Sequence, residues 1–237
     1  MANLPDLFDP LRAPAAPPTA LAARIQASVE QSRAPGSTFA ARQLIAALGV
    51  VLALVVGSWL TYSFAGRPPL RVDLFELPFL GALARLALLL LLAAWTTTLA
   101  LAPGRNGLGS KVALLVSASA LVAPLHAILS AVAPLRTELG LVAARELHPL
   151  GLPCGLIAVA VGLLVLGAFG FALRRAVPAA PMARAAAVGA AAGAWAGVAL
   201  FLLCPSSDAL HILLGHALPV GAYALLGMAL LPRWLRP

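Results

Sequence analysis

Long, unbroken runs of apolar residues dominate the chain, and short segments rich in proline, glycine and charge separate them. A helix needs about 20 mostly apolar residues to cross the roughly 30 Å hydrocarbon core of a bilayer. The runs do not alternate with polar residues, and aromatic residues, at 6%, are too few for the girdles of a membrane β-barrel. The pattern therefore predicts an all-α fold, a polytopic membrane protein built as a six-transmembrane-helix bundle. The expected helices are residues 44–64, 77–102, 112–133, 154–173, 185–203 and 212–231.

The composition leads to the same class of protein. Hydrophobic residues make up 62% of the chain and charged residues 10%, against about 45–50% and about 25% in soluble domains. A soluble fold of 237 residues has too little interior to bury that much apolar surface. The same numbers exclude intrinsic disorder, which requires low hydrophobicity and high charge.

The distribution of basic residues predicts the orientation, because loops on the cytoplasmic side carry an excess of Lys and Arg. Outside the six runs, one side would have Arg67, Arg71, Arg136 and Arg145. The other side would have Arg12, Arg24, Arg33, Arg42, Arg105, Lys111, Arg174, Arg175, Arg184, Arg233 and Arg236. We expect the richer side, with both termini, to be cytoplasmic (N-in/C-in). The net charge of +8 then reflects topology, and no direct binding of nucleic acid is expected.

The N-terminal segment, residues 1–43, differs from the membrane domain, residues 44–237. After a proline-rich stretch, Thr19 can cap a short helix over residues 20–31. Leu21, Ile25 and Val29 form one apolar stripe on that helix. So short a helix is marginal alone in water. Its stripe could lie on the membrane lipid, dock into the groove of a partner protein, or remain solvated.

The two cysteines, Cys154 and Cys204, begin the fourth run and follow the fifth, so a helical hairpin places both on the outer side. There they could form a disulfide. With His211 or Asp208 they could instead hold a soft metal ion or sense redox state. They could also pack as inert thiols. His216 falls near the same face, but no His-x3-His or Cys-x2-Cys spacing supports a metal site beyond Cys154 and Cys204.

Two further features concern the membrane helices. Gly189, Gly193 and Gly197 lie on one face of the fifth helix, which fits close packing inside the bundle or, less often, a dimer face. No arrangement of nucleophile and base, phosphate-binding loop or paired intramembrane carboxylates is present. The chain is therefore not expected to be an enzyme, and no bound cofactor is expected.

Several ordered motifs resemble the NrsF (negative regulator of sigma F) family of six-span membrane anti-sigma factors. The most specific are Gly151-Leu-Pro-Cys154 at the start of the fourth helix and Cys204-Pro-Ser-Ser-Asp208 after the fifth. Others are Leu70-Arg-Val-Asp-Leu74, Pro103-Gly-Arg105, Pro178-Ala-Ala-Pro181 and Arg233-Trp-Leu235, with His216 between the last helices.

The resemblance implies a bacterial inner-membrane protein that sequesters an extracytoplasmic-function sigma factor through its cytosolic N-terminus. It also implies that an envelope, redox or metal stress signal acts at Cys154 and Cys204 and releases the sigma factor. Asp208, His211 and His216 are secondary candidates for sensing, because they lie near the same outer face. Two other classes remain open from the residues alone. They are a structural or assembly membrane protein and a small permease.

The predicted topology can be tested with reporter fusions. Fusions within residues 67–73, 134–153 or at Ser206 should score as external, because the positive-inside rule places these segments opposite the Arg-rich loops. Fusions at residues 103–111 and at the C-terminus should score as cytoplasmic. A cytoplasmic signal from any of the first three sites would contradict the orientation.

Overall fold

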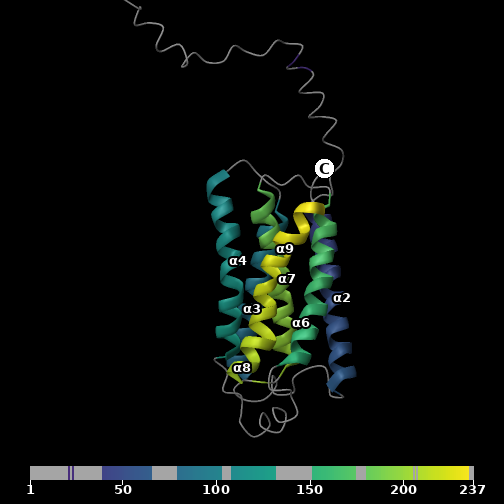
Figure 1. The fold of residues 1–237 in the computed structure, drawn as a ribbon, viewed down its shortest axis with the longest axis vertical. Helices are drawn as coiled ribbons and strands as arrows, with labels where there is room; N and C mark the ends of the chain where they lie inside the picture. The colour runs from purple at the N-terminus through teal and green to yellow at the C-terminus, as the bar shows by residue number, and fades with distance from the viewer. Residues whose placement is uncertain are drawn as a thin grey trace, which may run out of the picture. The chain divides into compact units, whose positions relative to one another are not determined.

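The computed structural model describes residues 39–65, 79–102, 108–131, 151–174, 180–204, 206 and 208–234, together with Leu21 and Ala23. The chain divides into two units, residues 1–36 and residues 37–237. The described part of the second unit is helical. Its elements are α2 (Phe39–Ala65), α3 (Phe79–Leu101), α4 (Leu108–Ala131), α6 (Leu152–Leu173), α7 (Pro181–Leu203), α8 (Ala209–Ile212), the π-helix η3 (Leu213–Ala217) and α9 (Leu218–Trp234) (Figure 1).

Six helical stretches are long and apolar enough to cross a membrane, as the hydrophobic runs predicted. The chain is therefore a multi-pass membrane protein, and the all-α fold class is confirmed. The sixth stretch, Ala209–Arg233, contains α8, η3 and α9 joined end to end. Of the predicted N-terminal stripe, Leu21 is helical and exposed, whereas Ile25 and Val29 lie outside the described residues.

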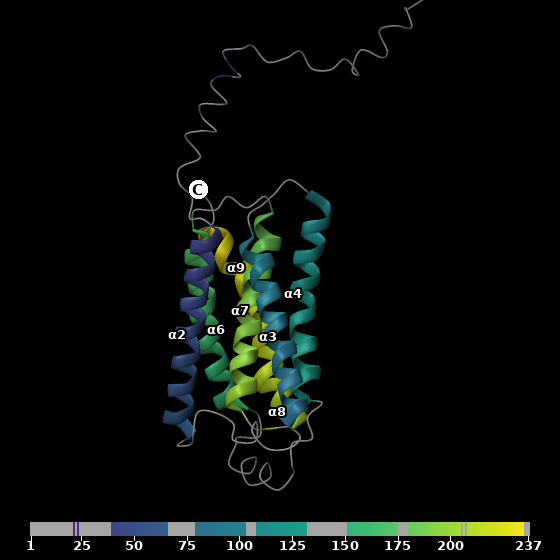
Figure 2. The same ribbon diagram turned by 180° about the vertical axis from the view of Figure 1, so that it is seen from behind.

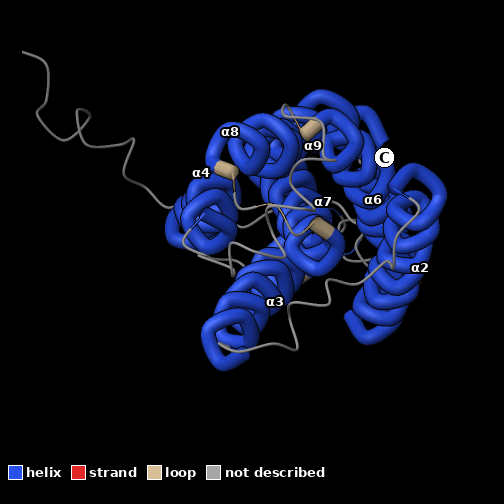
Figure 3. Tube along the Cα trace, turned by 90° about the horizontal axis from the view of Figure 1, so that it is seen from below, coloured by secondary structure: helices blue, strands red, loops and turns tan. Residues whose placement is uncertain are grey.

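Helix α7 is the centre of the bundle. It packs against α9, α3, α4 and α6, and almost all of its residues are buried. The view along the bundle shows α7 surrounded by its neighbours (Figure 3). Helix α2 lies to one side and packs mainly along α6. The outer helices expose large apolar side chains on the surface of the bundle, for example Leu48, Trp59 and Leu80. Such a surface suits contact with lipid.

Close contact between α7 and α9 depends on glycine. A methyl group on Gly189 would meet the backbone carbonyl of Tyr223, and one on Gly193 would meet that of Val220. From the other side, a methyl group on Gly227 would meet the carbonyl of Ala185. The glycine face that the sequence assigned to bundle packing or to a dimer is therefore used inside the bundle. Small residues allow such approach of two backbones in membranes.

The last membrane helix contains a π-helical turn close to Pro219. Pro219 lacks an amide hydrogen, and its ring would clash with the carbonyl of the residue four positions earlier, Gly215. The wider π-helical turn of η3 ends at Ala217, two residues before Pro219, and such turns accommodate local disruption within an α-helix. This turn contains His216.

Successive helices alternate in direction, as the front and back views show (Figures 1 and 2). The beginning of α6, the end of α7 and the short helix α8 consequently lie at one end of the bundle. We call this the thiol end, because Cys154 is the third residue of α6 and Cys204 directly follows α7.

Replacement of a glycine by alanine adds one methyl group, which should destabilise the protein only where that glycine is closely packed. Gly189→Ala places its methyl group against the Tyr223 backbone, so we expect a lower melting temperature in detergent. Overpacking of this kind costs about 1–3 kcal/mol in the free energy of unfolding. Gly167→Ala is the matched control, since nothing lies within 4 Å of a methyl group there. Equal melting temperatures for the two variants would contradict the packing described above.

Candidate functional site

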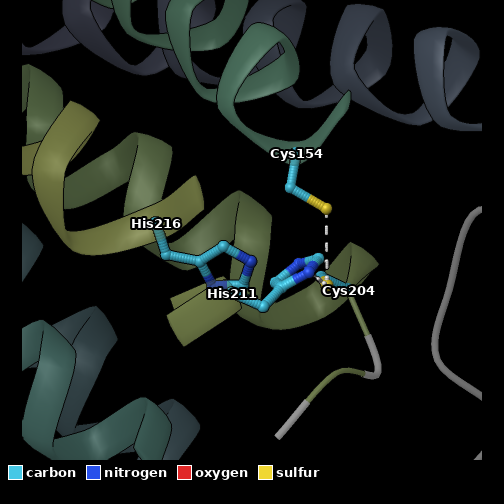
Figure 4. Close-up of side chains that lie close together, drawn as sticks. All are labelled: Cys154, Cys204, His211 and His216. Atoms are coloured by element: carbon cyan, nitrogen blue, oxygen red, sulfur yellow. Dashed lines mark hydrogen bonds between the residues drawn. The ribbon is translucent and has the colours of Figure 1, made fainter. Parts of the chain in front are cut away.

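Four side chains converge at the thiol end: Cys154 from α6, Cys204 after α7, His211 from α8 and His216 from η3 (Figure 4). One potential ligand atom from each lies within 4.8 Å of the others, and all four residues are buried. The sequence pointed to both cysteines, with both histidines as secondary candidates. The structure brings these four together.

The backbone at the start of α6 positions Cys154. Gly151 has a φ of 65°, a left-handed conformation that glycine adopts without strain, and Pro153 lies in the first turn of the helix. A Cβ atom on Gly151 would lie 2.9 Å from the Cα of Gly215. The start of α6 and the π-helix are thus in backbone contact, and Cys154 lies beside the segment that carries His216.

The two thiols interact directly. The Cys154 thiol donates a hydrogen bond to Cys204 Sγ, with 3.4 Å between the sulfur atoms. Cys204 Sγ also lies 3.3 Å from His211 Nε2. The hydrogen bond from Cys154 holds the pKa of the Cys204 thiol well below its usual range, and His211 and His216 add to this effect against the opposing effect of burial.

Asp208 has a different position from the one expected. Its carboxylate accepts a hydrogen bond of 2.7 Å from the backbone N–H of His211, so Asp208 is the N-cap of α8. It is exposed and does not belong to the cluster of four. Its contribution is to fix the first turn of α8, from which the His211 side chain reaches Cys204.

A third buried histidine, His126 of α4, extends the cluster into the bundle. Its ring centroid lies 6.2 Å from that of His216, which in turn lies 5.3 Å from that of His211. His126 occupies the space left by Gly197, where a Cβ atom would come within 2.7 Å of its Nδ1. The sequence showed a histidine within an apolar run, but it did not indicate which neighbours the ring would meet.

Three imidazole nitrogens in this row lack a hydrogen-bond partner among the described residues: Nδ1 of His126 and both ring nitrogens of His216. His126 and His216 are 1% and 2% exposed, respectively. A buried polar atom without a partner costs about 1–3 kcal/mol. Side chains retained at that cost within a membrane helix are usually functional.

The chemistry of the site follows from its donors. Cys154, the third residue of α6, and Cys204, which directly follows α7, have their sulfur atoms side by side. Two adjacent thiols can be oxidised to a disulfide. Thiolate sulfur and imidazole nitrogen are also the ligands that soft and borderline metal ions prefer. The side chains at the thiol end can therefore form a disulfide or bind a soft metal ion.

Comparisons with known proteins give one informative result. The family model named NrsF, described as "Negative regulator of sigma F", matches residues 21–236, nearly the whole chain. No curated protein matches the sequence. No solved structure matches it either.

Proposed function

Because this chain belongs to the NrsF family, negative regulators of sigma F, we propose that it holds an extracytoplasmic-function sigma factor at the bacterial inner membrane and releases it when a stress signal reaches the thiol end. The family match carries this proposal, since it covers both the membrane domain and part of the N-terminal segment. An anti-sigma role, rather than catalysis, is what the family implies.

The N-terminal segment is the proposed binding site for the sigma factor. The family match begins at Leu21, the first residue of the apolar stripe. Leu21 is helical and 49% exposed, so its side chain is accessible to a partner protein. An amphipathic helix docks its apolar face into a groove through residues spaced three or four apart, and Ile25 and Val29 continue that spacing.

The proposed topology places both chain ends in the cytoplasm and the thiol end outside. This orientation agrees with the excess of Arg at the opposite end of the bundle, where Arg42, Arg174, Arg184 and Arg233 lie among the described residues. It also separates the two tasks. The outer thiol site receives the stimulus, while residues 1–43 contact the sigma factor.

The packing offers a route between these two places. Cys154 lies on α6, and α2, which directly follows the N-terminal segment, packs mainly along α6. Gly57 of α2 contacts Val161 of α6 so closely that a Cβ atom would lie 2.8 Å from its side chain. In the proposed mechanism, a change at the thiols moves the start of α6 against α7, and α2 follows α6.

The sigma-factor contact can be tested with one charge. Ile25→Asp should place a carboxylate in the docked stripe and release the sigma factor, so capture by the full-length protein should fall and the regulon's expression should rise. Gln26→Asp adds the same charge outside the stripe and should leave both unchanged. Full capture by the Ile25→Asp protein would show that the stripe does not bind the sigma factor.

The two cysteines give a second test, which separates a sensor from a structural staple. If they sense the stimulus, Cys154→Ser and Cys204→Ser should each abolish induction by oxidant or metal while the protein accumulates normally. If they only staple α6 to α7, each change should lower protein levels regardless of stimulus. Immunoblots and a regulon reporter measure both quantities, and normal levels with normal induction would reject both roles.

A further inference from the structure

Two distances between potential ligand atoms at the thiol end lie close to the edges of a tetrahedral metal site. With metal–sulfur distances of about 2.3 Å and metal–nitrogen distances of about 2.0–2.1 Å, a tetrahedron has edges of about 3.8 Å between sulfurs and about 3.6 Å between sulfur and nitrogen. The Cys154–Cys204 sulfur separation is 3.4 Å, and Cys204 Sγ lies 3.3 Å from His211 Nε2. These two distances differ from the corresponding tetrahedral edges by only a few tenths of an ångström.

The remaining ligand is His216, whose ring is buried and makes no hydrogen bond within the described part of the chain. Its ring stands edge-on to that of His211, at 76°, and one of its nitrogens lies within 4.8 Å of the other three ligand atoms. A buried imidazole nitrogen that has no hydrogen-bond partner among the described residues and lies beside two thiols has the position of a metal ligand. A disulfide would use the two thiols and leave His216 without a partner.

The charge of the four side chains indicates which kind of ion the site would bind. When both thiols lose their protons, two thiolates and two neutral imidazoles carry a charge of −2, which a divalent cation cancels. A neutral centre suits a buried site, because an uncompensated charge there is strongly unfavourable. None of the four clustered side chains offers an oxygen ligand, whereas Mg2+ and Ca2+ prefer oxygen. Thiolate and imidazole together favour Zn2+ or its softer analogue Cd2+.

We propose that Cys154, Cys204, His211 and His216 form a four-ligand site for one divalent soft cation, Zn2+ or Cd2+. Each bound ion displaces the two thiol protons, which pass to solvent, and no electron is transferred. The ion ties together the start of α6, the end of α7 and the π-helix. Its regulatory consequence rests on the proposed anti-sigma function, but binding itself does not.

The test uses full-length protein purified in detergent under reducing conditions and titrated with Cd2+. Ultraviolet thiolate-to-cadmium charge transfer should saturate at one Cd2+ per chain, and Zn2+ should compete for the site. X-ray absorption of the wild-type cadmium complex should show two sulfur and two nitrogen ligands. This last measurement needs no variant, so it stands even where a substitution impairs folding.

Two histidine variants distinguish a histidine that binds the metal ion from one that only lies beside the site. His216→Ala should weaken Cd2+ binding by more than the roughly ten- to hundred-fold that loss of an outer-shell partner costs. His126→Ala removes an equally buried imidazole outside the cluster of four and should bind Cd2+ nearly as wild type. Gel filtration and helical circular dichroism verify that both variants fold.

Several results would overturn the site: no saturation at one equivalent, a coordination shell without nitrogen, or unchanged affinity in the His216→Ala protein. Binding that survives replacement of both cysteines would place the ion elsewhere and equally reject it. Because no sigma factor is present, these outcomes are independent of the anti-sigma function. Conversely, Ile25→Asp should abolish sigma-factor capture and leave Cd2+ binding intact.

Discussion

The backbone contact between α7 and α9 is the constraint on which the rest of the bundle depends. Between helices in lipid there is little hydrophobic driving force, so association relies on close packing and on small residues. Gly189 and Gly193 on α7 and Gly227 on α9 bring the two backbones together along much of their length. Helix α7 also contacts α3, α4, α6 and the π-helix. The position of α7 against α9 therefore constrains where these neighbouring elements can lie.

Hydrophobicity was sufficient to predict the six membrane helices, because a bilayer imposes both their length and their composition. The boundaries were less accurate, and the reason is physical. Helix α2 begins at Phe39 rather than at residue 44, since a helix continues through Arg42 and Gln43 once its backbone hydrogen bonds are formed. Helix α7 likewise begins at Pro181, a residue that suits the first turn of a helix although it adds no strong hydrophobic signal.

The thiol site could be predicted only in part. Alternating helix direction was enough to place Cys154 and Cys204 at the same end, and the structure brings their sulfurs together. The direction of His216 depends on η3. Each residue of an α-helix turns the chain by about 100°, so one extra residue in a π-helical turn rotates every following side chain. A regular helical periodicity therefore assigns residues after the turn to the wrong face. Asp208 was grouped with the site because it is near in sequence, but its carboxylate is engaged by the backbone of α8.

The same arrangement explains why a small change at the thiol end need not remain local. Cys154 belongs to α6, Cys204 to the end of α7, and both histidines to the helical stretch of α8 and η3 that leads into α9, so the four side chains come from three different segments. Helix α7 is held by α9, whereas the start of α6 meets the π-helix through Gly151 and Gly215 without side chains between them. Of these elements, α6 is also the main support of α2. Packed interfaces shift between discrete arrangements rather than deforming continuously. The close contacts of Gly49 with Ala168 and of Gly57 with Val161 therefore connect α6 to α2, the helix that follows the N-terminal segment in the chain.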